Sequence, residues 1–362
     1  MVIESYLYEK VNGFVICKTC WHNCKLKDQQ WGICRVRKNE NGKLMVYNYG
    51  LASSIALDPI EKKPLHNYKP GSKVLSFGSV SCNFRCDHCQ NFEISFADLS
   101  YPYLRELKPE EVLRLCKDRK ADGIAWTYNE PAIWHEFALD VSKIAKENGY
   151  FIVYVTNGYM SPEAIEQFKW LDAANVDVKA FSQRFYSKIC KAKLENVLKT
   201  VEYMHKKGIF VEITYLVIPG ENDGKEEIKE FANWVVSVDK RIPVHFSRFH
   251  PDFKMTDKIA TPIATLEQAF EIAKGAGVEY VYVGNVWGHK FENTFCPNCG
   301  ELLIERRGFY IGRVNLKDTK CPNCGYRQNI VLWRILKKSL SLSVNLLRGR
   351  QGLHSRCGSG GS

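Results

Sequence analysis

Residues 74–91 read VLSFGSVSCNFRCDHCQN, an apolar run followed at once by three cysteines. The run over 74–80 predicts a buried strand, and Cys82, Cys86 and Cys89 follow it in a C-x3-C-x2-C spacing. A closed zinc or iron–sulfur site normally takes four protein ligands. Three thiolates on one loop therefore favour a [4Fe–4S] cluster whose fourth iron is left for another molecule. The alternatives are a zinc site completed by a distant ligand, and buried cysteines that bind nothing.

A regular alternation of short apolar runs and helical stretches continues from this loop. Six strand-then-helix repeats closed by a seventh strand predict an α/β fold with a parallel sheet, a partial (β/α)6 TIM-type barrel. A doubly wound open sheet would give a similar rhythm and stays an alternative. The expected strands are 74–80, 123–128, 151–156, 174–179, 209–218, 243–249 and 278–283, and the expected helices are 109–120, 131–148, 161–170, 184–207, 225–239 and 264–276.

Polar residues follow nearly every expected strand. In β/α barrels the chemistry sits at the carboxyl ends of the strands, so these residues should meet at one mouth. After the three-cysteine loop come Tyr128-Asn129-Glu130-Pro131, Thr156-Asn157-Gly158, Asp177-Val178-Lys179, Pro219-Gly220-Glu221-Asn222-Asp223 and Ser247-Arg248-Phe249-His250.

Two further cysteine groups flank the expected barrel. At the C-terminal side the sequence CPNCG occurs twice, and this spacing predicts a zinc ribbon, with a single rubredoxin-like iron as the alternative. The N-terminal group has four cysteines, which would close a structural zinc site or hold an auxiliary iron–sulfur cluster; the sequence does not separate the two. The ribbon cysteines are Cys296, Cys299, Cys321 and Cys324, and the N-terminal ones are Cys17, Cys20, Cys24 and Cys34.

Charge and composition, together with the cysteine groups, indicate how the chain is divided into modules. Of 362 residues with a net charge of +11, the segment 301–362 holds 12 Lys and Arg against 3 Asp and Glu. The expected modules are an N-terminal cysteine module (1–72), the barrel (73–290), the ribbon (291–332) and a basic tail (333–362) whose final GSGGS resembles a linker. With no signal peptide or transmembrane run, the 14 cysteines indicate metal binding and a cytoplasmic protein rather than disulfides.

SCNFRCDHCQN in this place resembles the signature of the radical S-adenosylmethionine (SAM) superfamily. The barrel is similar to that of the activating enzymes of glycyl-radical proteins. The combination of CKTCWHNC, WGICRVR, LDPIEKKPLHNYKPGS, WTYNEP and VDVKAF resembles the radical SAM enzymes of the AmmeMemoRadiSam system. The resemblance covers residues 15–290 and implies an oxidoreductase. In the enzyme that this resemblance implies, a [4Fe–4S] cluster on Cys82, Cys86 and Cys89 cleaves SAM to a 5′-deoxyadenosyl radical that abstracts hydrogen from a substrate.

The same resemblance assigns cofactor-binding roles at the other strand ends. Glu130 matches an acceptor for the SAM ammonium, although the usual glycines before it are replaced by Tyr128 and Asn129; a plain acid at a helix N-terminus is the alternative. Val155 stands where a cation-binding acid is common. The further residues that match the SAM site are Asn129, Thr156, Asn157, Asp177, Lys179 and His250.

Three functions follow from these patterns. The first is a radical SAM enzyme acting on a protein or peptide, with an external electron donor and, by resemblance, Memo-type and AMMECR-type protein partners. The second is a radical SAM enzyme that modifies RNA or tRNA through the basic ribbon. The third, a non-catalytic metal-binding or nucleic-acid-binding protein, leaves the three-cysteine loop and the polar strand ends unexplained. No membrane association is expected.

Overall fold

The structure is a computed structural model that describes residues 1–333. Its centre is an eight-stranded sheet in the order β16-β15-β14-β13-β12-β11-β9-β8. The strands pair in parallel except β8 (Ser54–Pro59), which runs antiparallel to β9. The sheet is open, with β16 and β8 at its edges. The parallel strands are β9 (Lys73–Gly78), β11 (Gly123–Trp126), β12 (Phe151–Thr156), β13 (Ala173–Asp177), β14 (Phe210–Val217), β15 (Val244–Arg248) and β16 (Val281–Gly284).

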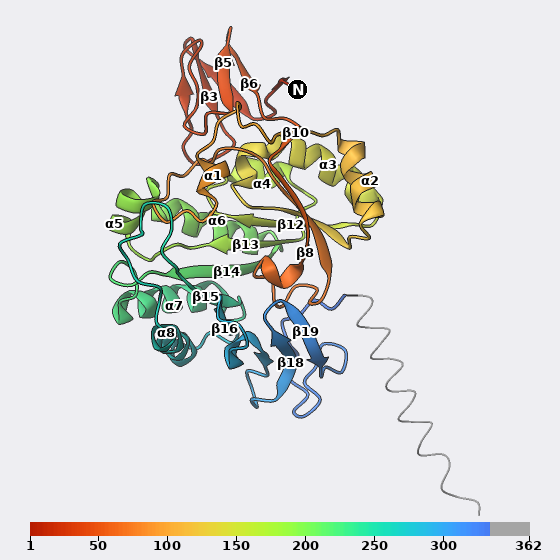
Figure 1. Ribbon diagram of the computed structural model, residues 1–362, viewed down its shortest axis with the longest axis vertical. Coiled ribbons are helices and arrows are strands. Elements are labelled where there is room, and N and C mark those ends of the chain that lie inside the picture. The colour runs from red at the N-terminus through yellow and green to blue at the C-terminus, as the bar shows by residue number, and fades with distance from the viewer. Residues whose placement is uncertain (334–362) are drawn as a thin grey trace, which may run out of the picture.

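Helices connect each parallel strand to the next, so the predicted parallel α/β fold is confirmed (Figure 1). The strand β12 and the helix α7 match their predicted bounds residue for residue. Every residue of β11 is buried, as expected for a strand covered on both faces. The helices are α1 (Phe92–Ser95), α2 (Pro109–Asp118), α3 (His135–Glu147), α4 (Pro162–Gln167), α5 (Gln183–Phe185), α6 (Leu194–Lys206), α7 (Lys225–Asp239) and α8 (Ile263–Ala276).

Two sequence predictions of local structure are wrong. The single helix expected over 184–207 is divided into α5, a π-helical turn (Tyr186–Cys190) and α6. The division occurs because Lys191 has a φ of 61°, a left-handed conformation that ends a helical turn. The edge strand β8 is not among the expected strands, because Pro59 and the charged residues that follow it hide its pattern.

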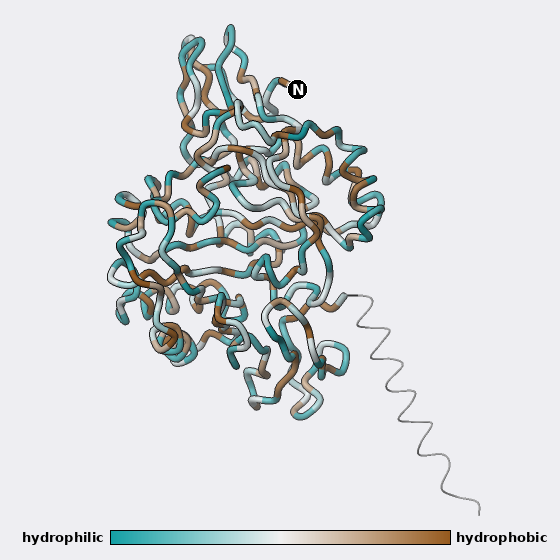
Figure 2. The backbone as a smooth tube through the Cα atoms, viewed as in Figure 1, coloured by the Kyte–Doolittle hydropathy of each residue, from teal (hydrophilic) through white to brown (hydrophobic). Residues whose placement is uncertain are grey.

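Residues before β8 form small antiparallel sheets that stand at the top of Figure 1. A buried ion pair attaches these sheets to α3, which packs on the central sheet. Arg37 donates from Nη1 and Nη2 to the Glu136 carboxylate on α3, at 2.7 and 2.6 Å. The tips of these hairpins are hydrophilic (Figure 2). The strands are β1 (Ile3–Glu4), β2 (Tyr8–Val11), β3 (Phe14–Cys17), β4 (Lys25–Leu26), β5 (Arg37–Glu40), β6 (Lys43–Val46) and β7 (Leu51–Ala52), which pairs with β10 (Arg105–Glu106).

The C-terminal residues form a three-stranded antiparallel sheet beside the β16 edge, from β17 (Thr294–Phe295), β18 (Leu302–Arg307) and β19 (Tyr310–Val314). Arg306 donates from Nη2 to the carbonyl of His66 at 2.8 Å and so joins this sheet to the segment before β9. Trp333, the first residue of the expected basic tail, packs against Phe151. The rest of that tail, with Cys357, lies outside the described residues. Within residues 1–333, no helix is both long and apolar enough to cross a membrane.

Candidate active site and metal centres

The three-cysteine loop opens into a cavity of about 510 Å³ enclosed by the ends of the parallel strands. Cys82, Cys86 and Cys89 all line this cavity, and in the part of the chain that the structure describes no fourth thiol does. A volume of this size is typical of small-molecule sites. Burial raises the pKa of the Cys82 and Cys89 thiols. The loop therefore presents three neutral, desolvated thiols unless a metal takes them as thiolates.

At the second strand exit Tyr128 and Asn129 face the cavity, whereas Glu130 does not. Asn129 lines the cavity; it accepts from the backbone N–H of Ser79 at 3.1 Å and donates to the carbonyl of Ser81 at 2.8 Å. It thus fixes the chain just before Cys82. Tyr128, with a φ of 74°, also lines the cavity.

Glu130 does not itself line the cavity. Its side chain is fully buried and accepts from the backbone N–H of Ala132 and Asn157, at 2.9 and 2.8 Å, and from the hydroxyl of Thr156 at 2.8 Å. Burial raises the pKa of Glu130 to about 7. These contacts are those of a helix-capping acid, and they tie the second strand exit to the third. The contact of Glu130 with SAM stays a prediction.

The third and fourth strand exits supply the polar groups nearest the thiols. Asn157 lines the cavity and donates from Nδ2 to Oδ1 of Asn83 at 2.8 Å, whereas Thr156 faces Glu130. Asp177 and Lys179 both line the cavity and pair at 2.8 Å. Burial disfavours the ammonium, yet the neighbouring Asp177 side chain raises the pKa of Lys179 above its ordinary value. Lys179 is therefore a cation beside Cys86.

The sixth strand exit contributes less than expected. His250 is exposed, contacts the carbonyl of Pro251 at 3.1 Å and does not line the cavity. Arg248 donates from Nε to the carbonyl of Thr261 at 2.8 Å. Its predecessor Ser247 lines the cavity instead. The loop after the strand turns His250 outward, an orientation that strand alternation alone did not reveal.

Several residues at or beside this site are not among the predicted site residues. Cys190 hydrogen-bonds with the Cys86 thiol, and this contact together with burial raises the pKa of Cys86. His245 lines the cavity and pairs with the buried Glu212 at 2.7 Å. At the same end of the cavity Glu61 and His66 each keep a buried side-chain atom without a hydrogen-bond partner in the described residues. Glu61 and His66 gave no sequence signal, because they do not follow an expected strand.

The ribbon cysteines come together closely. The Sγ atoms of Cys296, Cys299, Cys321 and Cys324 all lie within 4.8 Å of one another. Two of their separations are 3.7 and 3.6 Å. Tetrahedral zinc with Zn–S bonds of about 2.3 Å requires thiolates about 3.8 Å apart. The group therefore has the spacing of a site for one metal ion.

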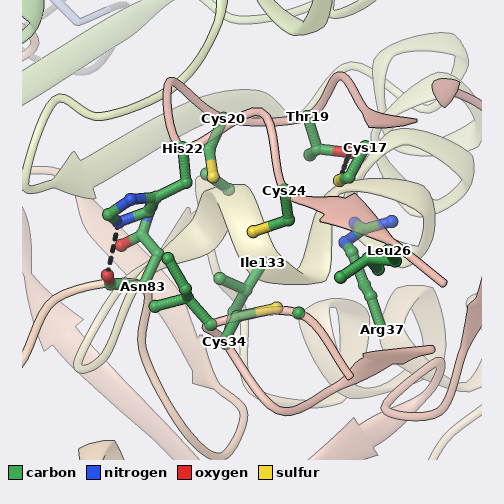
Figure 3. A pocket seen from close by; sticks show the side chains of 13 residues that line it. Cys17, Thr19, Cys20, His22, Cys24, Leu26, Cys34, Arg37, Asn83 and Ile133 are labelled. Carbon is green, nitrogen blue, oxygen red and sulfur yellow. Dashed lines mark hydrogen bonds between the residues drawn. The ribbon is translucent and has the colours of Figure 1, made fainter. Parts of the chain in front are cut away.

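The N-terminal cysteines surround a second, much smaller cavity (Figure 3). Cys17 ends β3, Cys20 and Cys24 follow in the next loop, and Cys34 precedes β5. His22, read as a bystander, points away from the thiols, and its Nε2 lies 2.9 Å from the carbonyl oxygen of Asn83. The N-terminal group therefore directly adjoins the loop that carries Cys82.

The chain is similar in sequence to a known superfamily and to several known proteins. The model of the Radical SAM superfamily matches residues 78–235. The uncharacterized protein MJ0808 of Methanocaldococcus jannaschii is 46% identical over 316 residues, which cover 86% of this chain and 94% of that protein. The pyruvate formate-lyase-activating enzyme of Clostridium pasteurianum is 26% identical over 52% of this chain and 84% of its own length. The putative glycyl-radical enzyme activating enzyme MJ1227 of Methanocaldococcus jannaschii is 26% identical over 44% of this chain and 66% of its own length.

Proposed function

Because this chain belongs to the radical SAM superfamily, we infer that Cys82, Cys86 and Cys89 hold a [4Fe–4S] cluster and that SAM binds beside it. The observation that carries this proposal is the convergence of these three thiols, and of no other described thiol, on one large cavity at the strand ends. When bound, such a cluster supplies the electron that cleaves SAM to methionine and a 5′-deoxyadenosyl radical. The electron comes from an external donor.

The residues of the cavity support this chemistry in distinct ways. Lys179 places a cation beside Cys86 and offsets the negative charge that thiolate ligands bring. Asn157 and Asn129 hold the cysteine loop in place through hydrogen bonds. Phe84 and Leu216 give the cavity apolar walls that keep water from a reactive radical.

For the SAM ammonium, Asp177 is better placed than Glu130. Asp177 lines the cavity, whereas Glu130 does not, and the oxygens of Glu130 already accept three hydrogen bonds from protein groups. A carboxylate beside an ammonium forms a charge-assisted hydrogen bond. Asp177 would then exchange part of its contact with Lys179 for the ligand.

We further propose that the substrate is a protein or a peptide. The relatives named as activating enzymes support this class, and so does the AmmeMemoRadiSam-like combination of motifs, with Memo-type and AMMECR-type proteins as partners. Aromatic side chains at the cavity rim add a physical reason: Phe309 lines the cavity, and Trp287 and Tyr310 beside it are 62% and 70% exposed. Exposed aromatic residues are common anchors for protein partners.

The two flanking cysteine groups fit the role of metal sites outside the reaction. The ribbon spacing fits zinc, and side-chain amides of Gln328 and Asn323 each donate to a ribbon thiol at 3.5 Å, as outer-shell partners of metal ligands do. The proposed zinc stabilises the sheet whose Gly308–Phe309 turn closes the cavity.

The test is an anaerobic assay of SAM cleavage with dithionite as the electron donor. We expect 5′-deoxyadenosine to form with the wild-type protein, and its absence from iron-replete protein would refute the proposal. To identify the substrate class, protein and RNA fractions from deuterium-labelled cells are added separately. Deuterium in 5′-deoxyadenosine only with the protein fraction supports a protein substrate, whereas deuterium only with the RNA fraction contradicts it.

A further inference from the structure

The four N-terminal cysteines form a built site rather than a chance grouping. Their cavity is otherwise lined mainly by apolar side chains, among them Leu26, Ile33 and Ile133. Backbone amides hydrogen-bond to three of the thiols: His22 to Cys20, Ile33 to Cys24 and Val36 to Cys34. Amide-to-sulfur hydrogen bonds in an apolar shell are the environment in which proteins hold metal thiolates.

The spacing of these thiols differs from that of the ribbon. Among residues 1–333 the ribbon set is the one group of three or more metal-binding side-chain atoms that all lie within 4.8 Å of one another. No three of the N-terminal thiols meet that limit, although four thiolates on a single zinc ion would stand about 3.8 Å apart. The N-terminal thiols are therefore arranged more widely than one metal ion requires.

The space between the thiols agrees with this difference. The cavity that the four cysteines line is about 10 Å³, room for roughly one water-sized sphere. Four sulfur atoms about 2.3 Å from a common centre would leave no such room. A Cβ placed on Gly32 would lie 3.8 Å from the Sγ atoms of both Cys24 and Cys34, so these two sulfurs flank the same small residue.

The three-cysteine loop provides an internal reference. Its thiols also fail to lie within 4.8 Å of one another, and its family is the one whose members hold a [4Fe–4S] cluster. In a cubane cluster the thiolates bind different iron atoms, so they stand farther apart than thiolates on one ion. Within one chain, the N-terminal group thus resembles the cluster loop in spacing and the ribbon in ligand number.

We propose that Cys17, Cys20, Cys24 and Cys34 hold a second, fully ligated [4Fe–4S] cluster, and not zinc. With four cysteine ligands this cluster has no open iron, so it does not bind SAM. It lies against the catalytic loop: Asn83 lines its cavity, and the preceding Cys82 lines the other. The comparison of thiol spacing rests on the function proposed for the Cys82 loop, but the N-terminal site itself is separate, because the two ligand sets share no residue.

The test counts iron, acid-labile sulfide and zinc in anaerobically prepared full-length protein. We expect about eight iron and eight sulfide per chain in the wild type, and about four of each in the triple variant C82A/C86A/C89A, with about one zinc in both. Cys24→Ala should lose about four iron and keep the cluster of the catalytic loop. Cys116→Ala, which removes a buried thiol from α2, should keep all eight.

The other outcomes separate the failure of this proposal from the failure of the proposed function. About two zinc per chain, with no iron left in the triple variant, would show a zinc site. About one iron without sulfide in that variant would show a rubredoxin-like site. If the catalytic loop held no cluster, the wild type and the triple variant would both contain about four iron, and only the function proposed above would fail. The wild-type and triple-variant counts decide the matter even where Cys24→Ala does not fold.

Discussion

The ribbon and the catalytic loop both rely on cysteine side chains, but the ribbon closes a metal site and the loop leaves one open. In the ribbon, four cysteines on two hairpin-like turns bring their sulfurs within 4.8 Å of one another. In the loop after β9, three cysteines spread around one end of a cavity of about 510 Å³. A closed set of ligands leaves a metal no free position, whereas an incomplete set reserves one for a substrate.

The surroundings of the ribbon cysteines also differ from those of the cysteines in the catalytic loop. Two ribbon cysteines, Cys296 and Cys321, are as buried as Cys82 and Cys86, but the ribbon thiols lie within a small hydrophobic cluster that includes Leu303 and Ile304. Cys82 and Cys86 instead face a large cavity beside the cation of Lys179. The comparison teaches that ligand number and access to a cavity, and not burial, separate a stabilising site from a reactive one.

The largest expected effect comes from breaking the open site. Cys86→Ala should abolish 5′-deoxyadenosine formation, because a cubane held by two thiolates loses its anchoring. The measurement is chromatography of anaerobic reactions with SAM and dithionite. Zinc content should not change, since the ribbon is a separate site.

Cys190→Ala is the matched control for Cys86→Ala, because it removes the neighbouring thiol, which does not line the cavity. It should keep most of the activity. If Cys86→Ala retained wild-type activity, the catalytic assignment of the three-cysteine loop would be wrong.

Breaking the closed site should affect stability instead. Cys321→Ala should lose about one zinc per chain and unfold the ribbon locally, because the binding free energy of a structural metal is also folding free energy. Limited proteolysis should then cut within 294–330, while iron content stays at the wild-type level. Iron loss in place of zinc loss would show that the ribbon holds iron.

The parallel α/β fold could be predicted because its strands are short apolar runs with polar exits. The approximate bounds of most strands followed from these runs, and Ser161 caps α4 as expected, accepting from the N–H of Ala164 at 3.1 Å. The convergence of Asn157, Asp177 and Lys179 with the thiols followed from one rule, that parallel strands end at a common edge.

The features of the site that could not be predicted from the sequence depend on contacts between residues far apart in the chain. The partner of Glu130 is the third strand exit, and the partner of Cys86 is Cys190, more than a hundred residues later in the sequence. The conformation of Lys191 that ends the π-helical turn has no glycine to signal it. The distances between thiols in the folded chain, which separate the ribbon from the other two cysteine groups, cannot be read from their spacing along the sequence.

A smaller effect should come from the cation beside the open site. Lys179→Met should slow SAM cleavage about tenfold to a hundredfold, the usual cost of losing a residue that supports metal ligands. Zinc content and ribbon proteolysis should not change. The measurement is the initial rate of 5′-deoxyadenosine formation at saturating SAM.

Two further variants interpret the Lys179→Met result. D177N/K179M removes both members of the ion pair and so separates the loss of a cation from the exposure of an unpaired acid. Lys143→Met removes an exposed lysine on α3 and should leave the rate unchanged. An unchanged rate in Lys179→Met as well would show that Lys179 does not support the site.

The smallest effect tests the thiols themselves without metal. A hydrogen bond from Asn298 and neighbouring backbone lowers the pKa of Cys324 to about 6, whereas burial raises the pKa of Cys82 above its ordinary value. A thiolate reacts and a thiol does not. In metal-free protein, brief alkylation with iodoacetamide should therefore modify Cys324 at a rate that rises through pH 6 and levels off above pH 7, while Cys82 stays slow. Peptide mass spectrometry after pulses between about pH 5 and pH 9 gives both rates.

Asn298→Ala sharpens this last comparison, because it removes the hydrogen bond that contributes most to the low pKa of Cys324. Its Cys324 profile should move toward the ordinary thiol range, near pH 8.5. Added zinc should protect Cys324 in the wild type. Equal profiles for Cys324 and Cys82 would mean that the metal-free ribbon has lost its fold. The ribbon would then depend on its metal for structure, whereas the catalytic loop would keep its buried thiols without one.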